Sequence, residues 1–172
     1  ILNRLNKVVR RVDTGRLRMS LSVCIFKNDK LYISAAAMPP AYLYSAETQS
    51  VDEIEIRNLP LGGLDNEQFE LVEKSFNKGD ILVLLSDGLP EAPDLEGNLL
   101  DYQPVMDWIE KVAHLGAGQV KQALIDLADD WLDGSQNPDD ITFVVFEKQQ
   151  NRGLKTQKEL EEEKNIKKVA LA

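Results

Sequence analysis

The sequence has very few of the side chains that form disulfides, thiolate metal sites and histidine-based active sites. It contains one cysteine, Cys24, and one histidine, His114. A single cysteine excludes an internal disulfide and a structural metal site made of thiolates. Cys24 lies in an alternating apolar segment, which favours a place in the core over a reactive role. His114 falls near the end of a predicted helix, where a contact with the helix dipole is favoured over catalysis.

Basic residues are outnumbered, and long apolar runs are missing. There are 29 acidic and 20 basic residues, and the formal net charge is -9. Nucleic acids and anionic membranes attract clusters of Lys and Arg, so this balance argues against both as partners and is compatible with cation binding. No apolar run is long enough to cross a bilayer and no signal peptide is visible, which predicts a cytoplasmic protein. The length of 172 residues suits one domain with a sizeable core.

The most informative stretch is a short apolar run followed by an acid and a glycine. Residues 81–85 read ILVLL and lie between Gly79 and Gly88. A run of this length between turn residues predicts a strand that is buried on both faces. Asp87 would then stand at the rim of the sheet, next to a glycine that permits a tight turn or the close approach of a ligand.

A second stretch has the same parts in the opposite order. Residues 137–146 read NPDDITFVVF, so that Asp139 and Asp140 come before the apolar run. If the two runs form neighbouring antiparallel strands, the end of the first lies beside the start of the second. The sequence therefore predicts that Asp87, Asp139 and Asp140 meet at one edge of a sheet.

The rest of the chain alternates between strand-like and helix-like segments. Apolar spacing and turn residues predict a helix over 1–11, strands over 17–26, 30–36, 41–45 (an edge strand), 51–56, 68–75, 80–87 and 140–147, helices over 102–113 and 120–131, and a charged helical tail over 153–172. This order predicts an α+β fold with a mostly antiparallel sheet.

Acids at strand ends, without a cluster of His or Cys, are the ligands that hard cations prefer. Mg²⁺ and Mn²⁺ bind carboxylate and water oxygens, and two such ions can activate a water molecule and hold a phosphoryl group for in-line attack. The same residues have a simpler interpretation, because Asp and Gly at strand ends are common turn residues. From spacing alone both interpretations stay open.

At these residues the sequence resembles a known family. Residues 79–92 (GDILVLLSDGLPEA) are similar to the "GD-apolar-(T/S)DG…EA" block of bacterial PP2C-like serine/threonine phosphatases of the SpoIIE/RsbU type, and residues 138–142 (PDDIT) resemble their closing "DDIT" block. Segments 41–44 and 59–62 also match in order and spacing. The resemblance covers residues 1 to about 148.

The resemblance implies a fold, a metal centre and a substrate class. It implies a PP2C-like antiparallel β-sandwich flanked by helices, with Asp87 and Asp139 as ligands of a two-metal Mn²⁺ or Mg²⁺ site. Asp140 would lie beside them and act on the metals through water or through another ligand. The substrate would be a phosphoserine or phosphothreonine protein, such as an anti-sigma-factor antagonist.

Two blocks of the family pattern are missing, and a third is altered. The "GGD…D" strand and the "D-(V/I)-S-G-(K/H)-G" block, which bring the other metal-binding aspartates, do not occur here. We therefore expect residues 1–148 to be the C-terminal two thirds of the phosphatase domain, without its N-terminal strands and first helix, and residues 149–172 to be a tail. The family's "NAGHPP" reads AAAMPP at residues 35–40.

These departures leave two functions open. The first is a metal-dependent protein phosphatase that is weakly active or inactive as this piece of chain. The second is a non-catalytic regulatory or protein-binding module that keeps the fold without the chemistry. A plain structural domain is a third interpretation, and it requires both acidic blocks to be accidental.

Overall fold

The computed structural model describes residues 1–12 and 18–149. In chain order, the elements are α1 (Leu2–Arg11), β1 (Leu21–Lys27), β2 (Lys30–Ala36), β3 (Ala41–Ser45), β4 (Ser50–Ile54), β5 (Val72–Ser75), β6 (Ile81–Leu85), α2 (Tyr102–Val112), the short 3₁₀ helix η1 (Ala113–Leu115), α3 (Ala117–Leu132) and β7 (Phe143–Glu147). The predicted tail helix lies outside the described residues.

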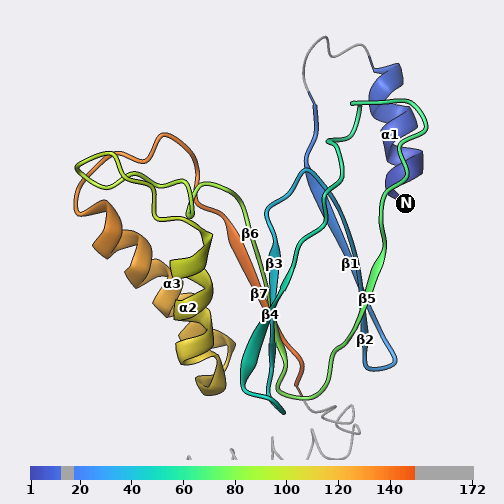
Figure 1. Cartoon of the computed structure of the whole chain (residues 1–172). Helices are drawn as coiled ribbons and strands as arrows, with labels where there is room; N and C mark the ends of the chain where they lie inside the picture. The colour runs from blue at the N-terminus through green and yellow to red at the C-terminus, as the bar shows by residue number, and fades with distance from the viewer. Residues whose placement is uncertain (13–17, 150–172) are drawn as a thin grey trace, which may run out of the picture.

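The strands form two antiparallel sheets that face each other. One sheet has the order β1-β2-β5 and the other the order β4-β3-β6-β7. In Figure 1 helices α2 and α3 lie beside the four-stranded sheet, while α1 lies on the far side of the three-stranded sheet. The predicted α+β sandwich with flanking helices is confirmed.

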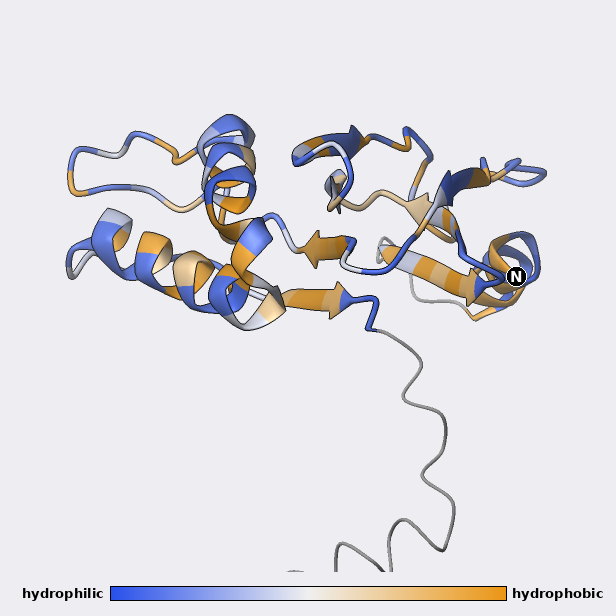
Figure 2. Ribbon diagram, turned by 90° about the horizontal axis from the view of Figure 1, so that it is seen from below, coloured by the Kyte–Doolittle hydropathy of each residue, from blue (hydrophilic) through white to orange (hydrophobic). Residues whose placement is uncertain are grey.

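Three apolar clusters hold these layers together. The first joins α2 and α3 to the four-stranded sheet, and the second fills the space between the two sheets. The third packs Leu2 of α1 against Ala36 and Leu61 on the outer side of the three-stranded sheet. Figure 2 shows the same arrangement, with hydrophobic strands inside and helices that are hydrophobic on one side only.

β6 is the strand predicted to be buried on both faces, and the structure confirms it. Ile81, Leu82 and Val83 have no exposed surface, and Leu85 is 4% exposed. Val83 belongs to the cluster under the helices, whereas Leu82 belongs to the cluster between the sheets. An alternating strand would need only one apolar face, so the continuous run follows from this double burial.

Some predicted strands differ from the observed ones. Segment 41–45 is not an edge strand, because β3 pairs with both β4 and β6. Its first four residues are buried, and the prolines at 39 and 40, which suggested an edge, precede the strand rather than interrupt it. Of segment 68–75, only Val72–Ser75 pairs as a strand. Strands 80–87 and 140–147 shorten to 81–85 and 143–147.

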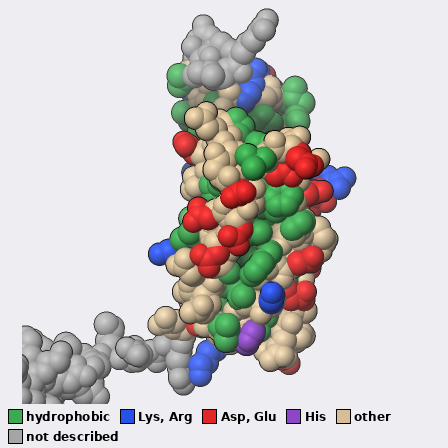
Figure 3. Space-filling model, turned by 90° about the vertical axis from the view of Figure 1, so that its left-hand side faces the viewer, with side chains coloured by type: hydrophobic (Ala, Val, Ile, Leu, Met, Phe, Trp, Pro, Cys, Tyr) green, Lys and Arg blue, Asp and Glu red, His purple; other side chains and the backbone are tan. Residues whose placement is uncertain are grey.

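The outer surface of the helix layer is rich in acids. Figure 3 shows Asp and Glu side chains flanking hydrophobic ones on this side of the molecule, with few basic side chains among them. Among the described residues there is no helix of sufficient length and apolarity to cross a membrane. The cytoplasmic location stays a prediction.

Candidate active site

The two acidic segments lie side by side, as the sequence predicts. β6 and β7 are antiparallel neighbours, with Leu85 opposite Phe143. The pairing continues past both strands, because the backbone N–H of Ser86 donates to the carbonyl of Thr142 at 2.8 Å. The end of β6 and the approach to β7 therefore form one edge.

The side chain of Ser86 joins the two segments at this edge by hydrogen bonds. Its hydroxyl donates to the carbonyl of Asp140 at 3.1 Å and accepts a hydrogen bond from the backbone N–H of Thr142, also at 3.1 Å. Two backbone groups that lack strand partners are thereby satisfied. The hydroxyl is thus a structural link between the two segments.

Gly88 and Asn137 bring the segments still closer. A Cβ atom on Gly88 would lie 2.3 Å from the carbonyl oxygen of Asp140, so only glycine fits here. The Asn137 side-chain amide donates to the carbonyl of Gly88 at 2.9 Å. The other end of that amide, Oδ1, is buried without a hydrogen-bond partner.

The three predicted acids all stand exposed at this edge. Asp87 lines a cavity of about 460 Å³, which Glu91 and Tyr102 also line. Asp139 accepts a hydrogen bond at Oδ1 from the backbone N–H of Asp140 at 2.8 Å. Asp140 therefore supports Asp139 through its backbone.

The oxygen atoms at this edge are of the type that a hard cation binds, but there are few of them among the described residues. Carboxylate and amide oxygens are the ligands of Mg²⁺ and Mn²⁺, and the uncommitted Oδ1 of Asn137 lies on the segment that carries Asp139. Within residues 1–12 and 18–149, however, no three or more His, Cys, Asp or Glu side chains are grouped as a metal cluster would require. Asp87 and Asp139 fit as part of a ligand set.

The pKa of Tyr102 reflects the negative charge around the cavity beside Asp87. Burial raises the pKa of its phenol, and the negative charges of Glu91, Asp87 and Asp101 raise it further. The ring therefore stays neutral at physiological pH, next to several carboxylates. Glu91 and Tyr102 were not predicted as site neighbours, although the "EA" of the first acidic block was a signal for Glu91.

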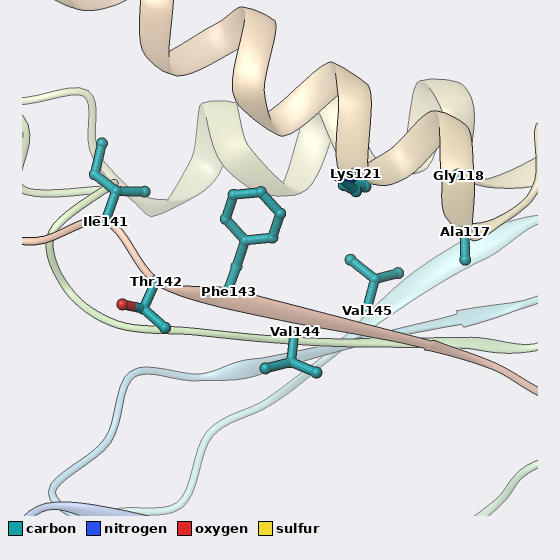
Figure 4. Close-up of a pocket in the computed structure, with 8 residues that line it drawn as sticks. All are labelled: Ala117, Gly118, Lys121, Ile141, Thr142, Phe143, Val144 and Val145. Carbon is teal, nitrogen blue, oxygen red and sulfur yellow. The ribbon is translucent and has the colours of Figure 1, made fainter.

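A larger cavity, of about 630 Å³, lies between α3 and β7 and has a different character. Figure 4 shows the side chains of Phe143 and Val145 pointing toward α3, while Val144 points the other way. Among the described residues that line it, Lys121 is the only charged one. These residues therefore offer no carboxylate for the predicted metal chemistry.

Asp80, the acid of the "GD" pair, belongs to the scaffold. It is 4% exposed, and its carboxylate accepts hydrogen bonds from the backbone N–H groups of Ala46 (2.9 Å) and Asn77 (2.5 Å). It joins the turn before β6 to the turn after β3. A buried carboxylate with two N–H donors is a structural anchor.

The altered AAAMPP loop keeps a conformation that suits glycine. Ala37 occupies the place of the family's glycine and has a φ of 47°. Its backbone N–H donates to the carbonyl of Asn58 at 3.1 Å, which holds the loop in place. An alanine in this left-handed region is strained.

Residues 1–149 match the family model described as stage II sporulation protein E (SpoIIE). The chain belongs to this family. Phosphoserine phosphatase RsbU of Bacillus subtilis is 24% identical over 148 residues, which are 85% of this chain and 44% of RsbU. The chain thus spans less than half of this SpoIIE-type relative.

Solved structures of SpoIIE-type and other PP2C domains share the fold. The SiaA-PP2C domain of Pseudomonas aeruginosa matches with a TM-score of 0.73 and 17% identity, over 86% of this chain and 59% of that one. The manganese-presoaked phosphatase domain of Bacillus subtilis SpoIIE matches with a TM-score of 0.60 and 16% identity, over 87% of this chain and 74% of that one. The PP2C-like fold is therefore established.

Proposed function

We propose that the protein carrying this chain is a metal-dependent serine/threonine protein phosphatase of bacterial signalling. The observation that carries the proposal is the edge at which Ser86 joins the end of β6 to the start of β7, with Asp87 on one side and Asp139 on the other. Membership of the SpoIIE family supports the reaction class. The substrate would be a phosphoserine or phosphothreonine protein, such as an anti-sigma-factor antagonist.

In this proposal Asp87 and Asp139 hold Mn²⁺ or Mg²⁺. Such ions, when bound, supply an activated water molecule and neutralise charge on the phosphoryl group. In this proposal the backbone N–H of Asp140, which donates to the Asp139 carboxylate, orients that carboxylate. Ser86 and Gly88 keep the two carboxylates on neighbouring backbone segments.

The ligand count favours weak metal binding by residues 1–172 alone. An octahedral ion held by two carboxylates keeps mostly water, so little distinguishes such a site from solvent. The small number of metal ligands in the described residues also supports the second candidate, a regulatory or protein-binding module with a PP2C-like fold.

Phosphatase assays of the full-length protein separate the two candidates. We expect hydrolysis of p-nitrophenyl phosphate and of a phosphoserine peptide that requires Mn²⁺ or Mg²⁺ and stops in EDTA. Asp87→Asn and Asp139→Asn should each lower kcat by at least about a hundredfold, because each removes a metal ligand. Asp126→Asn removes one exposed carboxylate from α3 and is the matched control.

A folded full-length protein without metal-dependent turnover would favour the binding module. Full activity of Asp87→Asn would show that Asp87 is a turn residue and would overturn the proposed site.

A further inference from the structure

The cavity beside Asp87 combines carboxylates with an apolar wall. Four charged residues other than Asp87 line it: Glu53, Glu55, Arg57 and Glu91. The guanidinium of Arg57 is already engaged with both oxygens of Glu55, at 2.7 and 2.9 Å. Among the described residues neither Glu53 nor Glu91 has a salt-bridge partner, so the cavity keeps a negative charge.

The apolar part of the lining comes from a different set of elements. Met38, Pro39 and Pro40, from the loop before β3, and Ile56, which follows β4, stand with the ring of Tyr102 at the start of α2. Proline offers no N–H, and the Tyr102 ring offers a face that attracts cations. This wall suits an aliphatic chain more than a phosphate group.

A long basic side chain has the two parts that this cavity matches. Lys and Arg lay their methylene stems along apolar surface and direct their charged heads to carboxylates. A volume of about 460 Å³ gives room for one such side chain and part of its backbone. Charge complementarity thus indicates a basic occupant.

We propose that this cavity recognises a Lys or Arg side chain of the phosphoprotein substrate, close to the phosphorylated residue. This inference rests on the proposed function, because it takes Asp87 to mark the place of the phosphoryl group. Asp87 lines the same cavity, and a residue of extended chain spans about 3.3–3.6 Å, so the basic residue lies within about two positions of the phosphoserine. Glu53 and Glu91 are the specificity-determining residues.

Arg57 could give the cavity the opposite preference, for acidic groups, and the test includes this alternative. If Arg57 left Glu55 to hold the phosphate or an acidic flank, acidic peptides would bind best. Its bidentate pairing with Glu55 and the acids around it argue against that arrangement.

Binding of three phosphoserine peptides to the full-length protein with Mn²⁺ tests the proposal. The peptides differ only at the two positions on each side of the phosphoserine, which are Arg, Gln or Glu, and binding is followed by fluorescence anisotropy. We expect the Arg peptide to bind about fivefold more tightly than the Gln peptide, and the Glu peptide to bind more weakly than both. Glu91→Gln should reduce the advantage of the Arg peptide.

Charge reversal gives the sharper result. Glu53→Lys should remove the preference for the Arg peptide and strengthen binding of the Glu peptide. The control is Asp126→Lys, because acids also cover the helix side of the molecule (Figure 3) and a general effect of net charge must be separated from a local one. In turnover assays we expect the Arg peptide to have the lowest KM and the three peptides to have similar kcat values.

Two outcomes would overturn the inference: equal affinity for the three peptides, or an equal shift in preference for Asp126→Lys and Glu53→Lys. Hydrolysis of p-nitrophenyl phosphate reports on the proposed function separately, since this small substrate has no flanking residues. If the protein hydrolyses p-nitrophenyl phosphate but shows no peptide preference, the proposed function stands and the inference about the cavity is wrong. A protein that binds the Arg peptide preferentially without turnover would lose the proposed function, and with it the assignment of the cavity to a substrate residue.

Discussion

A Cβ atom on Gly88 would lie 2.3 Å from the carbonyl oxygen of Asp140 and 2.8 Å from its carbonyl carbon. Both neighbours are backbone atoms, which cannot rotate away as a side chain would. The two acidic segments are thus as close as glycine allows, and the edge that carries Asp87 depends on this contact.

We expect Gly88→Ala to lower the free energy of unfolding by about 1–3 kcal/mol, because the backbone at Asp140 must shift. Urea denaturation of residues 1–172 measures the change. Gly118→Ala is the control, since a Cβ there meets nothing within 4 Å and it lies in the first turns of α3, where alanine is the better helix former. It should be neutral or stabilising, and equal losses for both variants would contradict the expectation.

Asp80→Asn tests the assignment of the "GD" acid to the scaffold. The change replaces one acceptor oxygen by an amide NH₂, which leaves the N–H of Asn77 or Ala46 facing another donor in a buried place. We expect a loss of about 2–4 kcal/mol in the free energy of unfolding. Asp126→Asn, at an exposed position, should stay within about 0.5 kcal/mol of the wild type. A small effect at Asp80 would show that water replaces its hydrogen bonds.

Ala37→Gly should stabilise the chain. With a φ of 47°, Ala37 pays about 1–2 kcal/mol for its left-handed backbone, and glycine relieves this cost but loses more entropy on folding. We expect a net gain of about 0.5–1 kcal/mol by thermal or urea denaturation. Ala123→Gly within α3 makes the same chemical change in a helix and should destabilise by at least about 1 kcal/mol.

Cys24 should react slowly with alkylating reagents while the protein is folded. Burial raises the pKa of its thiol to about 11, so at pH 8 the folded protein holds on the order of one thiolate in a thousand thiols. An unfolded thiol with a pKa of about 8.5 is roughly a quarter ionised at that pH. Labelling with iodoacetamide at pH 8 should be at least about a hundredfold slower without urea than in it. Similar rates would show that the strand around Cys24 opens readily.

The sequence predicted the two strands of the site well because each has an unmistakable local pattern. Five apolar residues between glycines predicted that β6 is buried on both faces. Antiparallel pairing then predicted that the acid after β6 and the acids before β7 lie at the same edge. Nothing local revealed that β3 is a central strand. Its run AYLY is continuously apolar, like β6, but the adjacent prolines weighed toward an edge. Strand order depends on long-range pairing, which periodicity does not encode.

The candidate site could be predicted only as far as its acids. Asp87, Asp139 and Asp140 belong to recognisable blocks, and their roles as ligands and support stay predictions. The hydrogen bonds by which Ser86 and Asn137 join the two segments could not be predicted, because their partners are 56 and 49 positions away. Such contacts exist only in the folded chain, and residue type alone does not reveal them.

The place of β7 in the sequence bears on how the protein is made. β6 ends at Leu85 and its partner β7 begins at Phe143, so the ribosome must add 58 further positions before the pair can form. At about 5–20 residues per second this takes roughly 3–12 s. Throughout that interval one side of an entirely apolar strand has unpaired N–H and C=O groups, the kind of edge on which other chains assemble. The nascent protein is therefore most in need of a chaperone between the synthesis of its first acidic block and that of its second.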